Sequence, residues 1–512
     1  DVDAFHRAWD SVVARHTALR SAFLGQHLDT PLQVVMRDAK PAFSVEDWRM
    51  LSASDQSRRM ADLEEAECAG GFDFARPPLM RLSLVRFAEQ DHRLVWSCHH
   101  ILLDGWSITI LLDELFDCYG ALSRRELPQL AAARPFRDYV TWLQSRSPAV
   151  AEALWRRRLA GFEAPTPLPL ERKSRAASPA ARYAEHEEGL QVELQALEGF
   201  ARRHHLTINT LVQGAWALLL GRYNGTEDVV FGVTVSGRPA ELADVERTVG
   251  LFINTLPMLD DTSPQTSVGD WLRSVQDRNV DLREHGWMPL YEIQRLAGRA
   301  GRPLFDTIFV FENYPVDEVL RAQQGDGPRT GRAEQVSITN YALTLAVFVT
   351  EAGIRLGFRY DRGLFDQQQI ERIQAAFACL LERIADGSGR PVGELHGLDV
   401  AAAQRVLDWS AGIAAPATTD DVIDVVAQIE RQAGRSPAAT ALICEGERIS
   451  YAELNARASR LARRIRARGI GWDAPVGLAF ERSIDMIVAV LAVLKAGAGY
   501  LPLDPDYPGQ RI

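Results

Sequence analysis

The hydrophobic pattern of this chain changes repeatedly between two periods, and this change limits the possible folds more than any other feature. Residues 80–87 and 92–100 alternate between apolar and polar side chains, which is typical of β-strands. Residues 3–23 instead carry apolar side chains at helical spacing, and residues 370–384 do so again. Because both periods recur along most of the chain, the pattern predicts an α/β fold with helices packed against sheets.

Two stretches with linker composition divide this pattern into blocks. Residues 163–182 are polar and rich in proline and arginine, and residues 411–419 are rich in alanine. A chain of 512 residues also exceeds what one core usually organises, so two or more domains are expected. The predicted division is residues 1–162, residues 163–410, a linker over 411–420 and a separate block over 421–512. Both ends interrupt a pattern, so we expect a fragment of a longer protein.

The remaining elements follow from the same two periods. In the first block, Asp104-Gly105 breaks the strand over 92–100, and Ser107 is a candidate N-cap for the helix that follows. In the second block, helices are expected near 207–223 and 268–285, and strands over 229–235, 251–258, 307–311, 343–349 and 354–360. In the last block, a β-turn-β unit over 441–449 precedes a helix over 451–469, a strand near 475–480 and a helix over 484–496.

Charge and cysteine content argue against several classes of function. The net charge is −11, so there is no basic excess to neutralise phosphates, and a nucleic-acid partner is not expected. The five cysteines are dispersed without CxxC spacing, which predicts reduced thiols in a cytoplasmic protein, with neither a disulfide framework nor a metal site. The sequence shows no signal peptide and no apolar run long enough to span a membrane, so no membrane association is expected.

Residues 99–105, with the sequence HHILLDG, are the most informative stretch. A strand that ends here places the imidazole of His100 at a sheet edge, where a neutral imidazole can accept a proton from an incoming nucleophile. Asp104 can orient the backbone, and the Gly105 N–H lies near a helix start, where negative charge is stabilised. This arrangement suits acyl transfer to an amine or an alcohol. On the residues alone, a structural role for both histidines is the commoner alternative.

The surrounding residues give this stretch a family context. Together with Trp106 and Ser107, HHILLDG resembles the HHxxxDG signature of nonribosomal peptide synthetase condensation domains, which belong with the chloramphenicol acetyltransferase-like acyltransferases. Other motifs of that family are resembled, in the expected order, by residues 15–23 (RHTALRSAF), 136–142 (FRDYVTW), 249–255 (VGLFINT) and 304–315 (LFDTIFVFENYP). Thr17 stands where the family usually has an acid. The resemblance covers roughly residues 1–410 and lacks only the family's first motif.

The resemblance implies two chloramphenicol acetyltransferase-like α/β sandwich lobes, in a V shape with a central tunnel. Residues 1–162 would form the N-lobe and residues 163–410 the C-lobe. Such domains join a peptidyl or acyl thioester to the amine of an aminoacyl thioester. Each substrate is carried on the phosphopantetheine arm of a partner carrier domain, upstream for the donor and downstream for the acceptor. The implied function is amide-bond formation in an elongation module, with no cofactor bound by the domain itself.

The same resemblance assigns chemical roles to three residues of the motif. His100 sits where the two arms meet, and it acts either as a general base toward the amine or as a group that positions it. A free amine is accessible near neutrality, because an α-ammonium has a pKa of about 8, so positioning alone can supply much of the effect. Gly105 donates its backbone N–H to the oxyanion, and His99 has a minor structural role.

Further residues are expected to support or line the tunnel. Asp104 is a structural support that pairs with Arg238, for which an exposed loop cation is the alternative. Trp106 and Ser107 line the tunnel near the acceptor, and core packing is the alternative for Trp106. Asn254 faces the cleft from the other lobe, with packing or loop capping as its alternative.

The donor is expected to end in a D-configured residue. Residues 289–294 (PLYEIQ), together with FENYP at 311–315, resemble condensation domains that follow an epimerisation domain. Domains that accept L-donors more often carry an HQDLPFE-like stretch there, and the DxxxxD pattern of heterocyclising relatives is absent from the sequence. We therefore expect a D-configured donor and an L-configured acceptor.

Residues 449–454 (ISYAEL) and 494–504 (LKAGAGYLPLD) resemble two motifs of adenylation domains. The phosphate loop and catalytic lysine of that family come later, so the ATP site is expected to be absent, this part inactive, and the rest of that domain a partner. Lys495 is expected to cap a helix end beside Gly497. The fusion favours an assembly-line enzyme over two alternatives: a coenzyme A-dependent acyltransferase, and a catalytically silent recruitment domain that tends to lose a motif histidine.

Overall fold

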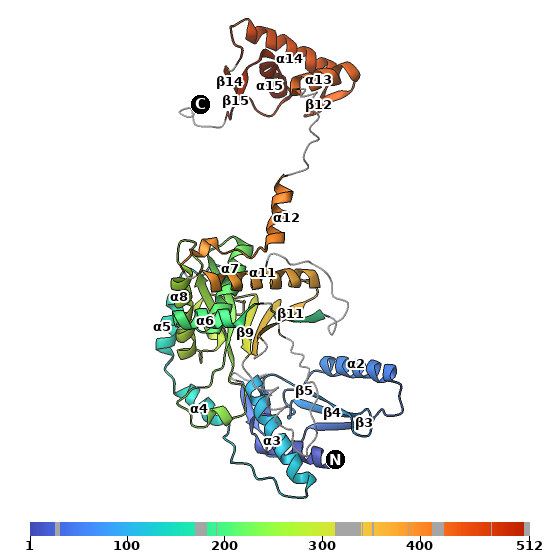
Figure 1. Ribbon diagram of the computed structural model, residues 1–512, viewed down its shortest axis with the longest axis vertical. Coiled ribbons are helices and arrows are strands. Elements are labelled where there is room, and N and C mark those ends of the chain that lie inside the picture. The colour runs from blue at the N-terminus through green and yellow to red at the C-terminus, as the bar shows by residue number, and fades with distance from the viewer. Residues whose placement is uncertain are drawn as a thin grey trace. The chain divides into compact units, whose positions relative to one another are not determined.

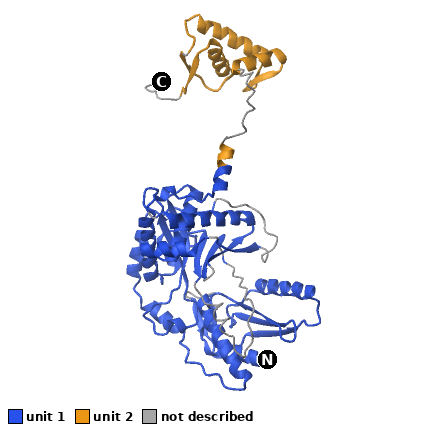
Figure 2. Cartoon of the chain, viewed as in Figure 1, with its two compact units in different colours: residues 1–405 blue, residues 406–512 orange. Residues whose placement is uncertain are grey.

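The computed structural model describes residues 1–25, 31–168, 182–190, 192–312, 339, 341–350, 353–387, 389–411, 424–472 and 474–505. These residues form two compact units, residues 1–405 and 406–512 (Figure 2). The boundary falls inside helix α12 (Val400–Ala411), close to the one expected after residue 410. Residues 169–181 and 412–420 of the two expected linkers lie outside the described residues, and so do residues 313–315 of the FENYP stretch.

The first sheet of unit 1 belongs to the N-terminal part of the chain. Strands β3 (Ala42–Asp47), β4 (Met80–Arg86) and β5 (His92–Cys98) pair in that order, β4 being parallel to β3 and antiparallel to β5. Helices α1 (Val2–Arg15) and α3 (Gly105–Ser123) pack together, and their apolar side chains share a core with β4. Helix α2 (Ala53–Ala69) contacts β5. The sheet thus places the end of β5 directly before α3.

The helix predicted over residues 3–23 ends earlier than its apolar spacing suggested. Helix α1 stops at Arg15, a 3₁₀ turn follows at Ala18–Arg20, and β1 (Ser21–Leu24) pairs with β2 (Leu32–Val35). No glycine or proline marks the change in the sequence. The apolar side chains keep their helical spacing beyond Arg15, but the pairing of this segment with β2 makes it a strand.

The second sheet of unit 1 has six strands in the order β6-β11-β10-β9-β7-β8. They are β6 (Tyr183–Gly189), β7 (Asp228–Val235), β8 (Asn254–Asp261), β9 (Thr307–Glu312), β10 (Leu343–Thr350) and β11 (Gly353–Asp361). Strand β9 runs parallel to β7 and β10, and the other neighbours are antiparallel. The strand predicted at 251–258 begins later, at Asn254.

Helices α7 (Ile208–Asn224) and α11 (Gln367–Asp386) cover one face of this sheet (Figure 1). Helix α7 is buried almost all round, and alternate residues of β10 and β11 join it in one continuous core. Further helices in the described part of unit 1 are α4 (Arg137–Ser145), α5 (Pro148–Arg158), α6 (Leu194–His204), α8 (Val268–Glu284) and α9 (Leu290–Leu296). The predicted mixed α/β class is therefore confirmed, with sheets of two, three and six strands in the described part of unit 1.

Beyond α12, the described part of unit 2 has three helices and two small two-stranded sheets, and its own core is formed by side chains of the helices and of the first of these sheets. Its elements are α13 (Val425–Arg435), β12 (Thr440–Cys444), β13 (Glu447–Ser450), α14 (Tyr451–Arg466), β14 (Pro475–Ala479), α15 (Ile484–Ala496) and β15 (Gly499–Leu503). Gly497 ends α15 at a φ of 82°. The capping role expected of Lys495 is wrong, because its buried ammonium forms an ion pair with Glu430 of α13.

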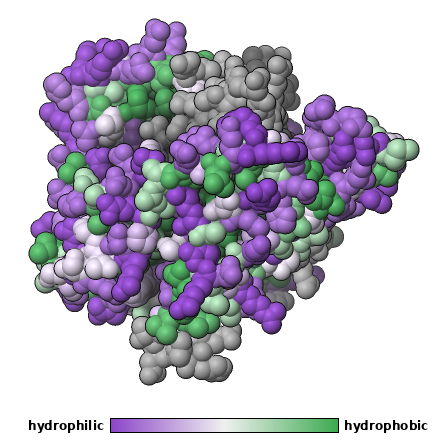
Figure 3. All heavy atoms as spheres, turned by 90° about the horizontal axis from the view of Figure 1, so that it is seen from below, coloured by the Kyte–Doolittle hydropathy of each residue, from purple (hydrophilic) through white to green (hydrophobic). Residues whose placement is uncertain are grey.

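Hydrophilic residues predominate on the face drawn in Figure 3, and apolar residues gather there in separate patches. This distribution follows from the burial of the apolar helix stripes and strand faces in the cores described above. Among the described residues, the helices are either too short or too polar to cross a bilayer.

Candidate active site

The HHILLDG stretch forms a tight turn and a helix start after β5. The strand predicted over 92–100 ends at Cys98, and a hydrogen bond of 3.1 Å from Leu102 N to His99 O closes a β-turn over residues 99–102. His100 occupies the second position of this turn and is exposed. Its imidazole has no hydrogen-bond or ion-pair partner among the described residues. The turn thus presents one free imidazole at the sheet edge.

His99 is turned into the protein, as its predicted structural role requires. Its Nδ1 accepts a hydrogen bond of 3.1 Å from Ile101 N, and its ring lies 4.8 Å from Phe74 and 6.3 Å from Phe72, both edge-on. Burial lowers the pKa of His99, and the positive charge of a protonated His100 lowers it further. A largely neutral His99 that packs and braces the turn leaves His100 as the histidine available for chemistry.

The start of α3 is fixed by Asp104, which occupies the N-cap position expected of Ser107. The Asp104 carboxylate accepts hydrogen bonds from Ser107 N at 2.8 Å and from Ser107 Oγ at 2.7 Å. The helix begins earlier than predicted, because Asp104, which follows the buried Leu102 and Leu103, already has the extended backbone conformation of an N-cap residue. Gly105 is therefore the first residue of α3, where its N–H lies at the positive end of the helix.

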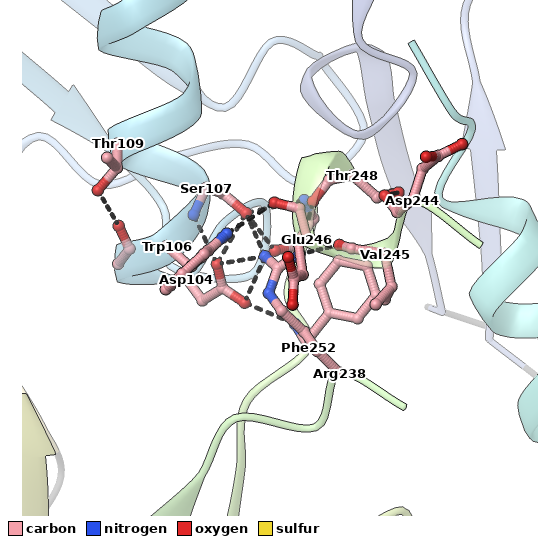
Figure 4. A network of polar contacts seen from close by, with 12 residues as sticks. Asp104, Trp106, Ser107, Thr109, Arg238, Asp244, Val245, Glu246, Thr248 and Phe252 are labelled. Carbon is pink, nitrogen blue, oxygen red and sulfur yellow. Dashed lines mark hydrogen bonds and ion pairs between the residues drawn. The ribbon is translucent and has the colours of Figure 1, made fainter. Parts of the chain in front are cut away.

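Asp104 also forms the ion pair with Arg238 that the sequence predicted (Figure 4). Arg238 Nη2 lies 3.0 Å from one carboxylate oxygen and 3.2 Å from the other, and Phe252 N donates to the second oxygen at 3.2 Å. Both charged side chains are buried, with exposed fractions of 1% for Asp104 and 7% for Arg238. Arg238 is therefore not the exposed loop cation of the alternative interpretation.

Arg238 belongs to a loop over residues 236–252, here called the crossing loop, which connects the larger sheet to the N-terminal part. Its guanidinium donates to the carbonyl oxygens of Val245 and Thr248 and lies 4.1 Å from the centre of the Phe252 ring. Val249 of the same loop is buried in the core formed by α1, α3 and β4. The crossing loop thus joins both parts of unit 1 at the helix start that follows the turn carrying His100.

Two glycines let the crossing loop approach its neighbours closely. Gly237 has a φ of 59°, and a Cβ there would lie 1.8 Å from Phe252 O. A Cβ on Gly250 would lie 2.1 Å from the ring of Phe136. Neither glycine was singled out from the sequence, although a glycine beside Arg238 was the available signal for a strained turn.

Ser107 and Trp106 take part in the same junction. Ser107 is fully buried at 0% exposure, and its Oγ accepts a hydrogen bond from Gly250 N at 3.1 Å. The same Oγ lies 2.8 Å from Gly250 O and 2.7 Å from the Asp104 carboxylate, so these two acceptors share its single hydroxyl proton. We therefore assign Ser107 to the junction in place of the expected tunnel wall. Trp106 is half-buried, and its indole N–H donates to Glu246 O of the crossing loop at 2.7 Å. This contact holds the indole in place, whichever surface it lines.

Asn254 and Cys98 are both accounted for by their surroundings. The Asn254 amide donates to Gly286 O at 2.8 Å and to Met288 O at 2.7 Å, which matches the loop-capping alternative. Burial raises the pKa of the Cys98 thiol to about 11, so this neighbour of the motif stays protonated near neutrality and is a poor nucleophile. Within the described ranges, His, Cys, Asp and Glu side chains form no group of three or more that could hold a metal ion.

Comparison with known proteins gives two matches along the chain. Residues 1–407 match the family model described as "Condensation domain", and residues 429–512 match the one described as "AMP-binding enzyme". One of the subunits of linear gramicidin synthase from Brevibacillus parabrevis is 41% identical over 518 residues, and one of the subunits of mycosubtilin synthase from Bacillus subtilis is 34% identical over 517. Both alignments cover 100% of this chain, which spans only 7% and 20% of those relatives.

Solved structures of similar fold include multidomain and single-domain proteins. A four-domain nonribosomal peptide synthetase bound to AMP and glycine has a TM-score of 0.70 at 21% identity, covering 99% of this chain and 39% of that one. The first condensation domain of the calcium-dependent antibiotic synthetase, in complex with a substrate analogue, has a TM-score of 0.60 at 21% identity, covering 77% and 90%. The X-domain from teicoplanin biosynthesis has a TM-score of 0.65 at 24% identity, covering 77% and 90%.

Proposed function

The chain belongs to the condensation-domain family of nonribosomal peptide synthetases, as its motifs predicted, and from this premise we propose that it forms an amide bond between two carrier-bound substrates. The donor is a peptidyl or acyl thioester and the acceptor is an aminoacyl thioester. The observation that carries the proposal is the exposed, unpartnered imidazole of His100, on a turn that the buried Asp104–Arg238 pair holds in place.

The proposed reaction needs no covalent enzyme intermediate. The lone pair of the acceptor amine forms a bond to the thioester carbonyl carbon, and negative charge develops on the carbonyl oxygen. The carbon–sulfur bond then breaks, the carbonyl reforms, and the proton lost by nitrogen ends on the leaving thiolate. His100 takes up this proton or holds the amine toward the carbonyl, while the Gly105 N–H at the start of α3 stabilises the oxyanion. Asp104 and Arg238 act on the chemistry only by fixing the turn.

The proposed partners are an upstream donor carrier domain and a downstream acceptor carrier domain, which deliver the substrates on 4'-phosphopantetheine arms through the two mouths of a tunnel between the lobes. The AMP-binding match at residues 429–512 supports a place beside an adenylation domain, whose remainder is a further partner. We propose no adenylating activity and no ATP site for these residues alone. We also place the chain in the bacterial cytoplasm, because its cysteines are free thiols and its relatives are bacterial.

The proposed donor ends in a D-configured residue. The support is the sequence over residues 289–294, of which Pro289 is the N-cap of α9. Glu292 is the only charged residue in this stretch, and it pairs with Arg295 at 2.8 Å. The stretch therefore lacks the aspartate that the HQDLPFE-like form contains. This preference is separable from the reaction itself, because it concerns the shape of the donor site and not the groups at His100.

A condensation assay on the complete module tests both proposals. Donor carriers loaded with peptides ending in a D- or an L-residue are mixed with a loaded acceptor carrier, and the products are followed by mass spectrometry. We expect product from the D-ending donor and a loss of at least about a hundredfold in His100→Ala. His92→Ala is the matched control, because it removes an exposed histidine from the opposite end of β5.

Each outcome of this assay has a distinct meaning. Product from the L-ending donor alone keeps the reaction and overturns the stereochemical proposal. A fully active His100→Ala variant assigns the rate to positioning by other groups. No product from either donor, with folded protein and loaded carriers, favours a silent recruitment domain. A protein of similar fold, the X-domain from teicoplanin biosynthesis, has been solved in complex with OxyB.

A further inference from the structure

A small crevice, here called the Tyr139 crevice, opens between α4 and the crossing loop. It has a volume of about 200 Å³ and is lined by Pro135 and Tyr139 on one side and by Leu242, Val245 and Phe252 of the loop on the other. An apolar cavity of about 150 Å³ accommodates a benzene molecule. The Tyr139 crevice therefore has room for one molecule with the size of a single ring.

Tyr139 supplies the polar group of this crevice. The residue is only 7% exposed, and its ring packs against Phe252 at a centre-to-centre distance of 4.6 Å. No described residue gives its hydroxyl a hydrogen-bond partner, yet the oxygen is not fully enclosed and meets solvent through the crevice. Burial raises the pKa of Tyr139 to about 12, so the hydroxyl stays protonated near neutrality and is available as a donor. A ligand oxygen in the crevice can accept that hydrogen bond.

The charged groups around the crevice are either paired or hydrated. Arg134, on the rim, pairs with Asp244 at 3.3 Å, and Asp138 is exposed to solvent on the same rim. Arg238, which carbonyl oxygens of the loop hold, is paired with Asp104. A charged ligand would lose its water in the crevice without gaining a counter-charge there, which carries a large free-energy penalty. The site therefore favours an uncharged molecule.

Three of the lining residues also hold the buried pair of Asp104 and Arg238 (Figure 4). The carbonyl oxygens of Val245 and Thr248 accept hydrogen bonds from Arg238, and the centre of the Phe252 ring lies 4.1 Å from its guanidinium. The crevice thus keeps its shape only while the crossing loop keeps this arrangement. A molecule that binds there stabilises the folded state of unit 1, because the unfolded chain has no such crevice.

We propose that the Tyr139 crevice binds one small uncharged molecule, made of a ring-sized apolar body and one carbonyl or hydroxyl oxygen that accepts the hydrogen bond of Tyr139. The apolar body packs against the side chains of Pro135, Leu242 and Phe252, and its burial supplies most of the affinity. None of the described residues that line the crevice belongs to the HHILLDG stretch, so this site is separate from the proposed condensation reaction.

Fluorine NMR on the full chain tests the proposal with para-fluoroacetophenone, a fluorinated ring with one carbonyl oxygen. In a titration its resonance should broaden saturably, with a dissociation constant of about 1 mM, because a molecule of this size has few atoms to contribute. Tyr139→Phe removes only the hydroxyl and should weaken binding about fivefold. Para-fluoroethylbenzene has no oxygen, so it should bind wild type and Tyr139→Phe equally.

A blocking variant locates the binding. Ala243 lies on the exposed rim of the crevice, and Ala243→Trp should fill the crevice and abolish saturable binding of both probes. Ala240→Trp is the matched control, because it places the same side chain at an exposed position of the same loop outside the crevice lining. Para-fluoroacetophenone should also raise the unfolding midpoint of unit 1 in wild type and in Ala240→Trp, but not in Ala243→Trp.

The outcomes decide between a specific site and none. Probe resonances that do not saturate up to about 10 mM in wild type, or that saturate equally in Ala243→Trp, overturn the site. Equal weakening of both probes in Tyr139→Phe overturns the assigned hydrogen bond. Circular dichroism verifies that each variant is folded, and the two probes on Tyr139→Phe carry the test if Ala243→Trp is not. No step of the test depends on condensation, so a failure of the proposed function leaves its result unchanged.

Discussion

Asp104 and Arg238 show how one buried pair can serve as the foundation of a site without touching a substrate. Their exposed fractions of 1% and 7% mean that both charged groups have lost the water molecules that would hydrate them in the unfolded chain. Hydrogen bonds from Ser107 and Phe252 to the carboxylate, and from Arg238 to two carbonyl oxygens, replace that water. A pair of this kind contributes little when complete, but loss of one partner leaves an uncompensated charge in the interior.

The first prediction concerns this asymmetry. Asp104→Ala should destabilise unit 1 by about 3–5 kcal/mol, because Arg238 then stays buried without its counter-charge. Urea unfolding followed by tryptophan fluorescence measures the loss. The matched control is Asp244→Ala in the crossing loop, where Asp244 pairs with Arg134 in an exposed ion pair and should contribute less than about 1 kcal/mol. Equal losses in the two variants would contradict the role given to the buried pair.

At the scale of elements, the contact between α1 and α3 holds the helix that begins at Gly105. Glu114 of α3 accepts hydrogen bonds from His16 Nε2 at 2.7 Å and from Arg15 Nε at 2.9 Å, both at the end of α1. Burial opposes the charge of Glu114, but these two hydrogen bonds outweigh it, and the pKa of the carboxyl is lowered from its usual 4.5. The RHTALRSAF stretch is thus a scaffold motif that anchors α3.

The second prediction follows from the sign of that shift. Because the pKa of Glu114 is lower in the folded chain than in the unfolded one, its stabilising contribution is complete above pH 4.5 and is lost as the pH falls through the lowered value. Glu114→Gln should therefore cost about 2 kcal/mol at pH 7, and the difference from wild type should shrink toward pH 3. Urea midpoints across this range test it. A difference that does not vary with pH would contradict the assignment.

Elements with a strong local signal were predictable, whereas those set by distant partners were not. The helix over residues 484–496 begins after a capping serine and ends at Gly497, and its predicted bounds are confirmed. By contrast, nothing local distinguishes Ser21–Leu24 from a continued helix, because its strand exists through pairing with β2. Strand β6 was missed for the same reason: its YAEHEEG sequence is polar and gains its place from β11.

The residues of the candidate site likewise differ in whether the local sequence could identify them. HHILLDG marks a strand end, a turn and a helix start within seven residues, so His100, Asp104 and Gly105 could be singled out from the sequence. The partner Arg238 was reached through the family resemblance. The catalytic role of His100 stays a prediction.

At the scale of the whole molecule, the chain has two units with separate cores. The core of unit 1 includes Phe358 of β11, and the core of unit 2 includes Leu491 of α15, each nearly fully buried. A chain built in this way departs from two-state behaviour, because each core can be lost cooperatively without the other. One unfolding free energy therefore does not describe it.

The third prediction is that calorimetry resolves two unfolding transitions. Leu491→Ala should lower the midpoint of the unit 2 transition alone, since it removes about 2–5 kcal/mol of packing from that core, and Phe358→Ala should lower only the midpoint of unit 1. Residual circular dichroism between the transitions identifies which unit remains folded. A single transition that moves in both variants would show that the units fold as one.

The crossing loop has a consequence for how such chains can recombine. Asp104 and Ser107 precede the loop by more than a hundred residues, yet their partners Arg238 and Gly250 lie within it, and Val249 packs into the core of helices near the N-terminus. A chimera with a single junction between residues 107 and 236 takes the two partners of every one of these pairs from different parent proteins. Chimeric synthetases should therefore inherit the stretch from Asp104 to Phe252 as one block, with junctions placed outside it.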